Sequence, residues 1–248
     1  MTKPTIVLLH GVGLDHTMWQ PVTALLADRY RVLALDLPGH GTNPPAPAGV
    51  SLDDLADAVA PQVPAGAHLI GFSLGALIAQ QLARYRPELV ASLTSVNSVC
   101  RRTEPERAAV LARLAAAERD FPASVEASLH RWYDGTGVAP ELVRATRDVL
   151  LANDVDSFLN CYRVFATGDA RIGPELSKIT VPSLALTGEL DGGSTPEMSR
   201  RLAAAMPHCR AQVVPGARHM LPVQEPEAFV TSITTFLRER DNVASQSV

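Results

Sequence analysis

The sequence predicts an α/β domain in which a mostly parallel sheet of about six strands is flanked by helices and carries a helical insertion. Two observations lead to this prediction. Short apolar runs alternate along the chain with amphipathic segments, which is the pattern of parallel strands joined by crossover helices. One long interval, residues 100–178, breaks the alternation because it contains helical patterns and no strand-like run.

Six short apolar runs are the expected strands. They are Thr5–His10, Arg31–Asp36, His68–Phe72, Ala91–Val96, Pro182–Thr187 and Ala211–Val214. The helices expected between and after them are Met18–Asp28, Leu52–Val63, Leu74–Tyr85, Pro196–Met206 and Pro226–Arg240. Two of these helices have clear start signals. Ser51 precedes a first turn with two carboxylates, and Thr195 precedes a proline at the first helical position.

The interval that breaks the alternation contains four further helical patterns. They are Glu104–Arg119, Ala123–Trp132, Pro140–Ala152 and Ser157–Ala166. We therefore expect a core formed by residues 1–99 and 179–248, with residues 100–178 inserted as a helical cap over one end of the sheet. A chain of 248 residues fits one such core with an insertion better than two domains.

Composition excludes several classes of protein. Hydrophobic residues make up 46% of the chain and charged residues 19%, so the chain as a whole is not disordered. The net charge of -4 argues against nucleic acid as a partner. The three cysteines, Cys100, Cys161 and Cys209, are widely spaced and suit neither a zinc site nor a disulfide framework. The apolar run near the N-terminus is too short for a signal or membrane segment, so we expect a cytoplasmic protein without membrane contact.

A serine at the junction of a predicted strand and a predicted helix is the first candidate catalytic residue. Ser73 lies in Gly71-Phe72-Ser73-Leu74-Gly75, and the two glycines allow a sharp turn in which the helix packs close to the strand. The amino end of the helix directs unpaired N–H groups at any oxyanion that forms beside the serine. This context favours Ser73 as a nucleophile over a serine in an ordinary loop.

A serine nucleophile requires a base, and the chain has seven histidines. His10 and His40 belong to glycine-rich turns, where we expect them to anchor the backbone. Four others are expected at the surface or with satisfied partners: His16, His68, His130 and His208. His219 differs because it follows the last strand on a loop just before the final helix, where its side chain can reach a serine at the sheet end.

The histidine in turn requires a carboxylate at another strand end. Asp191 follows the strand of "LALTG" and precedes two glycines. Glu189 is an alternative, but we expect it to lie nearer the strand with its side chain directed away from the histidine loop. Asn97, at the other suitable strand end, cannot supply a charge. The order Ser73, Asp191, His219 is the order typical of this kind of sheet.

The chain resembles an α/β-hydrolase in five motifs. They are "VLLHGVG" at 7–13, "DLPGHG" at 36–41, "GFSLG" at 71–75, "TGELD" at 187–191 and "GARHM" at 216–220. The resemblance implies an oxyanion hole formed by the backbone N–H groups of Val12 and Leu74. The segments 128–133 and 154–171 are similar to the cap of 3-oxoadipate enol-lactonase-like hydrolases. That family has a two-stranded hairpin before its first motif, and this hairpin is expected to be missing here because the first strand begins at Thr5.

These residues predict a hydrolase that cleaves a carboxylic ester or a lactone through an acyl-enzyme, without a cofactor or a metal. Carbon–carbon hydrolysis of a dienone acid uses the same residues and stays open. A hydroxynitrile-lyase-like enzyme and a non-catalytic receptor that binds a small molecule in the pocket are weaker alternatives. Arg131 and Trp132 are candidates for substrate binding, whereas Arg101 and Arg102 are expected at a solvated helix end. The expected partner is a small-molecule substrate, and the sequence allows a homo-oligomer.

Overall fold

The computed structural model describes the backbone of residues 3–246 and the side chains of residues 3–240. Its centre is a six-stranded parallel sheet with the strand order β2-β1-β3-β4-β5-β6. The strands are β1 Thr5–Leu9, β2 Arg31–Leu35, β3 Ala67–Phe72, β4 Val90–Val96, β5 Ser183–Gly188 and β6 Cys209–Val214. All six predicted strands are confirmed, each within two residues of its predicted ends. The first strand along the described chain is β1, which lies between β2 and β3 in the sheet.

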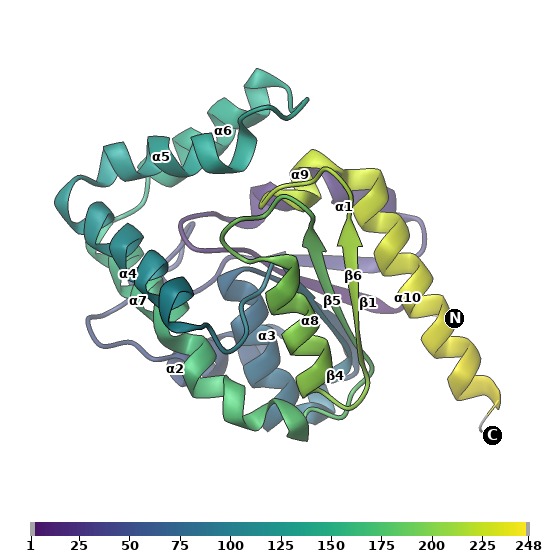
Figure 1. Cartoon of the computed structure of the whole chain (residues 1–248). Coiled ribbons are helices and arrows are strands. Elements are labelled where there is room, and N and C mark those ends of the chain that lie inside the picture. Colours follow the sequence, from purple (N-terminus) through teal and green to yellow (C-terminus); the bar gives the residue numbers. More distant parts are fainter. Residues whose placement is uncertain (1–2, 247–248) are drawn as a thin grey trace.

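Helices cover both faces of this sheet, which explains why β3 is buried at every position. They are α1 Gln20–Ala27, α2 Leu52–Val59, α3 Leu74–Tyr85, α8 Pro196–Ala205, α9 Leu221–Gln224 and α10 Pro226–Gln246. α3 and α8 pack on one face, while α1 and α10 pack together on the other (Figure 1). Within the described chain, α10 continues six residues beyond its predicted end at Arg240.

The predicted helix starts agree with the local hydrogen bonds. Ser51 and Asp54 form a capping box at the start of α2, with each side chain bonded to the other residue's backbone N–H. Thr195 accepts a hydrogen bond from the backbone N–H of Met198 at the start of α8. The segment expected as one helix from Leu52 to Val63 changes to a 3₁₀ turn at Ala60, where Pro61 follows.

The inserted segment forms four helices. They are α4 Glu104–Arg119, α5 Phe121–Tyr133, α6 Pro140–Leu151 and α7 Val155–Ile172. α7 is longer than predicted at both ends, and Asp154 caps its first turn by accepting from the N–H of Ser157. α7 packs against α3 and α4, and α5 and α6 extend beyond the arrowheads of β5 and β6 (Figure 1). The carboxyl ends of the strands therefore face the inserted helices, which we call the cap (residues 100–178).

One expectation for the start of the cap is wrong. Arg102 is not at a solvated helix end; its side chain is buried and pairs with Asp169 of α7 at 2.6 Å. The Nη1 atom that makes this pair also donates to the carbonyl oxygens of Phe165 and Ala166, while Nη2 has no partner among the described residues. Arg101 is exposed, as expected, and donates to the carbonyl oxygen of Gly173.

The three cysteines are free thiols, as the wide spacing predicted. Burial raises the pKa of Cys100 to about 11 and the pKa of Cys161 to about 12, so both stay protonated at neutral pH. Across the described part of the chain, no helix combines the length and the apolar character needed to cross a membrane.

Candidate active site

Ser73 occupies a strained turn between β3 and α3. Its backbone has φ 54° and ψ −111°, an unusual conformation for a residue with a side chain. Two hydrogen bonds hold this turn: the N–H of Ser73 donates to the carbonyl of Val96 at 2.9 Å, and the N–H of Gly75 donates to the carbonyl of His10 at 3.0 Å. The turn is therefore tied to the strands on both sides of β3.

The two glycines beside Ser73 are required by contacts between backbone atoms. A Cβ atom on Gly71 would lie 2.1 Å from the carbonyl oxygen of Gly75, and one on Gly75 would lie 2.3 Å from the carbonyl oxygen of Leu9. Neither neighbour can move without displacing a strand or the helix. The sequence prediction of a tight strand–turn–helix junction is thus supported by the described geometry.

His219 and Asp191 form a buried pair at the carboxyl ends of β6 and β5. The Nδ1 atom of His219 lies 2.7 Å from Oδ2 of Asp191. The same oxygen accepts a hydrogen bond from the side-chain amide of Asn97 at 2.7 Å, and Oδ1 accepts from the backbone N–H groups of Gly193 and Ser194. The carboxylate therefore has a fixed orientation, with one oxygen directed at the imidazole.

The surroundings of Asp191 keep it ionised. Burial acts to raise its pKa, but the charge of His219 and the hydrogen bonds from His219, Ser194 and Asn97 outweigh burial and lower the pKa below its usual value. A carboxylate that stays charged can hold one tautomer of the imidazole and stabilise it when it is protonated.

Glu189 lies in a different position from the one expected. Its side chain does not point away from the histidine loop, because its Oε2 accepts a hydrogen bond from the backbone N–H of Gly216 on that loop. Glu189 is exposed, however, and contacts the loop backbone, whereas the carboxylate of Asp191 contacts the His219 ring itself. The preference for Asp191 therefore agrees with the geometry. Glu189 lies nearer the strand, as expected, and only the expected direction of its side chain was wrong.

Ser73, Asp191 and His219 meet at one cavity of about 290 Å³. In the part of the chain that the structure describes, no hydrogen bond joins Ser73 Oγ to the imidazole of His219. Such bonds are often long when no substrate is bound. The His219 ring lies between two aromatic rings: Trp132 of the cap stacks on it at 5.5 Å between ring centroids, and Phe72 lies at 5.0 Å.

Two backbone N–H groups near Ser73 have no acceptor among the described residues. They belong to Val12, which lines the cavity, and to Leu74, which directly follows Ser73 as the first residue of α3. Free N–H groups beside a serine at a helix start can bind a developing oxyanion. His10 anchors the loop that carries Val12, because its Nε2 accepts a hydrogen bond from the backbone N–H of Leu37. This contact agrees with the anchoring role expected from the sequence. Burial lowers the pKa of His10 to about 3, so it is neutral.

Comparisons with known proteins agree with this architecture. The model of the alpha/beta hydrolase family matches residues 6–232. The chain belongs to this family. It is 32% identical over 238 residues to the (E)-2-((N-methylformamido)methylene)succinate hydrolase of Acinetobacter baylyi, covering 94% of this chain and 89% of that protein. It is 31% identical over 243 residues to the pimeloyl-[acyl-carrier protein] methyl ester esterase of Yersinia enterocolitica, covering 94% and 93%. The solved enol-lactonase of Burkholderia xenovorans has a TM-score of 0.85 and 29% identity, covering 96% and 92%.

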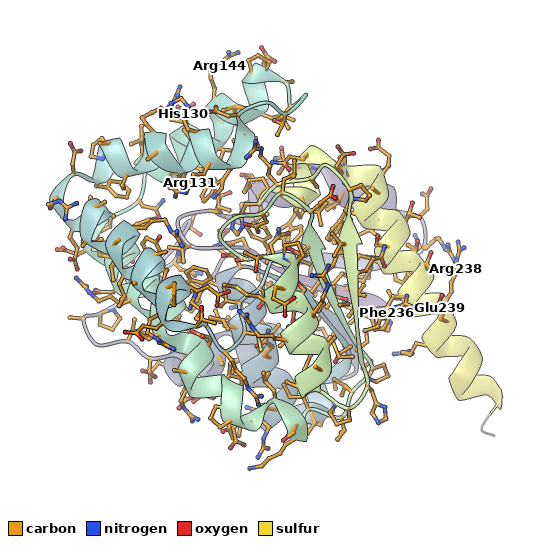
Figure 2. The ribbon with its side chains drawn as sticks, viewed as in Figure 1. His130, Arg131, Arg144, Phe236, Arg238 and Glu239 are labelled. Atoms are coloured by element: carbon orange, nitrogen blue, oxygen red, sulfur yellow. The ribbon has the colours of Figure 1, made fainter. Side chains whose placement is uncertain are left out.

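The cap of this alpha/beta hydrolase contributes positive charge to the cavity. Arg131 on α5 and Arg113 on α4 both line it. Figure 2 shows Arg131 on the side of α5 that faces the core, whereas His130 and Arg144 lie on the outer side of the cap. The guanidinium of Arg131 donates only to neutral groups, the carbonyl of Ala127 and the hydroxyl of Ser128, and partial burial together with the charge of Arg113 lowers its pKa.

Neither of these arginines has a carboxylate partner among the described residues. Other arginines of the cap do have one: Arg144, Arg147 and Arg163 each pair with a glutamate, while Arg102, Arg107 and Arg171 each lie within ion-pair distance of an aspartate. The sequence prediction named Arg131 and Trp132 but missed Arg113. Arg113 lies next to Leu114 on α4, a helix whose apolar and polar residues are not separated onto two faces. The sequence therefore gave no signal that Arg113 faces a cavity.

No metal site accompanies these groups in the described residues, since no three histidine, cysteine or carboxylate side chains are clustered so as to hold an ion. The described site therefore brings a serine hydroxyl and an imidazole–carboxylate pair to one cavity, with two backbone N–H groups near the serine. These are the components of nucleophilic acyl transfer.

Proposed function

We propose that this protein is a serine hydrolase that cleaves a carboxylic ester or a lactone of a small molecule through an acyl-enzyme. The observation that carries the proposal is the convergence of Ser73, Asp191 and His219 on one cavity, with Asp191 and His219 in direct contact. The esterase and the enol-lactonase to which the chain is similar also favour this class of reaction.

The proposed mechanism follows from the positions of these atoms. His219 Nε2 takes the proton of Ser73 while Oγ attacks the ester carbonyl carbon, and Asp191 holds Nδ1–H and stabilises the imidazolium. The N–H groups of Val12 and Leu74 stabilise the negative charge on the carbonyl oxygen. His219 then protonates the leaving alcohol. Water, activated by the same imidazole, attacks the acyl-enzyme and releases the acid and free Ser73.

The cap residues are proposed to bind the part of the substrate that does not react. Trp132 covers the imidazole and contributes an apolar wall, and the unpaired guanidinium of Arg131, with Arg113 beside it, suits a carboxylate on the substrate. A cavity of about 290 Å³ is at the small end of ligand pockets, which favours a small molecule over a long acyl chain.

Carbon–carbon hydrolysis of a dienone acid is the second candidate. The observation that favours it is the pair of unpaired arginines, because a dienone acid carries a carboxylate next to its reacting carbonyl system. The same serine, histidine and aspartate would act in it. The two candidates differ only in the substrate that is turned over. A lyase of the hydroxynitrile type is supported only by the missing hairpin, a feature of the fold and not of the site.

Turnover of a substrate panel by the wild type and by Ser73→Ala tests the proposal. We expect a burst of p-nitrophenol from p-nitrophenyl acetate, turnover within a panel of lactones, aryl esters and dienone acids, and covalent labelling of Ser73 by a fluorophosphonate. Ser73→Ala should lose all three, whereas Ser232→Ala, which removes a buried hydroxyl on α10 far from the cavity, should retain them. Inactivity of the wild type on every substrate, together with no labelling, would exclude a serine hydrolase.

A further inference from the structure

Two side-chain amides join the cap to the loops that carry the proposed catalytic groups. The first is Gln224 at the end of α9. Its Nε2 donates to the carbonyl oxygen of Trp132 in the last turn of α5, and its Oε1 accepts from the backbone N–H of Arg218 at 2.7 Å. Arg218 directly precedes His219. One side chain thus connects the histidine loop to the end of a cap helix.

The same helix end also contacts the histidine ring. Trp132 stacks on His219 with an angle of 26° between the ring planes, and Phe72 of the core also contacts the imidazole, at 5.0 Å between ring centroids. A shift of the α5 end would therefore change both contacts at once. It would move the Trp132 carbonyl away from Gln224 and the indole away from the imidazole.

The second amide is that of Asn153, which follows α6. Its Nδ2 donates to the carbonyl oxygen of Gly13 at 2.8 Å and to the carbonyl oxygens of Val149 and Leu150 in the last turn of α6. Gly13 directly follows Val12, one of the two proposed oxyanion donors. The cap also packs tightly here, because a Cβ atom on Gly13 would lie 2.6 Å from the ring of Phe158.

Both amides donate to carbonyl groups at helix ends. The last four carbonyl groups of a helix have no N–H partner within it, and the carbonyls of Trp132, Val149 and Leu150 belong to such last turns. These hydrogen bonds therefore give donors to carbonyl groups at the ends of α5 and α6. They also fix the position of the cap relative to the core.

We propose that Gln224 and Asn153 are positioning residues through which the cap holds the histidine loop and the oxyanion loop in their reactive positions. This inference rests on the proposed serine-hydrolase function. On this view the cap has a second role besides binding substrate. Its helix ends set the place of His219 relative to Ser73, and the place of the Val12 N–H relative to the reacting carbonyl.

Substitution of Gln224 tests the contact to the histidine loop. Gln224→Met has a side chain of similar length and removes both hydrogen bonds. Gln224→Glu keeps an acceptor for the Arg218 N–H but removes the donor to Trp132, and it serves as the second variant if the first does not fold. We expect kcat on p-nitrophenyl acetate to fall between about 10-fold and 100-fold in both variants, with KM within about 2-fold, because a small displacement of a catalytic group mainly slows the chemical step.

Fluorescence provides a readout that does not depend on activity. The chain has two tryptophans, and Trp19 is fully buried, so acrylamide quenching reports mainly on the half-buried Trp132. We expect a larger Stern–Volmer constant in Gln224→Met than in the wild type, because the α5 end is released from the histidine loop. Gln212→Met is the matched control, since the Gln212 amide bonds to Ser232 Oγ and does not line the cavity.

The outcomes separate this inference from the proposed function. A wild type that neither turns over esters nor labels with a fluorophosphonate refutes the proposed function, and the quenching comparison then still decides whether Gln224 fixes the α5 end. An active wild type with kcat and quenching unchanged in folded Gln224→Met overturns the positioning role alone. A fall in kcat that is equally large in Gln212→Met also overturns it, because the effect would then reflect general loss of packing.

Discussion

Replacement of Asp191 by asparagine is expected to lower kcat by about four orders of magnitude, and the hydrogen bonds around the carboxylate explain why. Its two oxygens accept four hydrogen bonds, two from backbone N–H groups and two from the side chains of His219 and Asn97. An amide has only one oxygen. Whichever way it is oriented, its NH₂ group must face two donors that were previously bonded to an oxygen.

The backbone donors of Gly193 and Ser194 cannot rotate, so the asparagine oxygen is expected to stay with them. Its NH₂ group then faces Asn97, which can turn its unpaired Oδ1 toward it, and His219, which must switch to the tautomer with the proton on Nε2. That tautomer cannot accept the proton of Ser73. Loss of the correct tautomer costs about 10⁴-fold in serine hydrolases, which corresponds to about 5.5 kcal/mol in the activation barrier.

The assay compares initial rates on p-nitrophenyl acetate for the wild type, Asp191→Asn and Glu189→Gln. Glu189 accepts only a loop N–H, so its variant should keep kcat within a few-fold of the wild type. The double substitution Asn97→Asp with Asp191→Asn places a carboxylate on the other side of the same contact and should recover at least about 10-fold of the lost rate. Wild-type activity in Asp191→Asn, or an equal loss in Glu189→Gln, would refute the assignment.

Three further predictions concern the charge and packing of the site. First, burial holds the pKa of His10 at about 3 against 6.5 in the unfolded chain. The unfolded state therefore binds more protons, and the free energy of unfolding should fall by about 2 kcal/mol between pH 6.5 and pH 5 through this residue. Urea titrations at the two pH values should show a smaller difference for His10→Asn than for the wild type, and equal differences would contradict this. Second, Gly75→Ala should lower the free energy of unfolding by about 3 kcal/mol, because its Cβ would lie 2.3 Å from a strand carbonyl, whereas Gly137→Ala, in open space, should leave the thermal midpoint unchanged. Similar midpoints for both variants would count against a tight turn at Ser73. Third, Arg113→Gln and Arg131→Gln should each lower kcat/KM about 10-fold for an aryl ester that carries a carboxylate, but not for p-nitrophenyl acetate, while Arg144→Gln should change neither. An equal loss on both esters would mean that the arginines support the cap and do not bind the substrate.

The sheet was predictable because its signal is local. Each strand is a short apolar run, and in the crossover helices apolar residues recur at helical spacing. Strands and helices could therefore both be placed from a few neighbouring residues. The positions of Ser73, Asp191 and His219 relative to the strand ends were also readable. Parallel strands bring their carboxyl ends to one edge of the sheet, so residues in the loops just after β3, β5 and β6 can meet at that edge.

Apart from some helix ends, the errors concern contacts between distant parts of the chain. Arg102 looks like a charged residue at a helix start, and its partner Asp169 is 67 residues away on a helix whose orientation the sequence does not give. The contact of Glu189 with the Gly216 N–H depends on how closely two loops approach each other. The amide bonds of Gln224 and Asn153 depend on where the cap helices end in space, which no periodicity encodes.

The buried pair of Arg102 and Asp169 also links the two ends of the cap. It joins the first residues of the insertion to α7, close to where the chain returns to the core. Removal of one partner would leave the other charge buried without compensation. Loss of either residue is therefore expected to loosen both connections between cap and core at once.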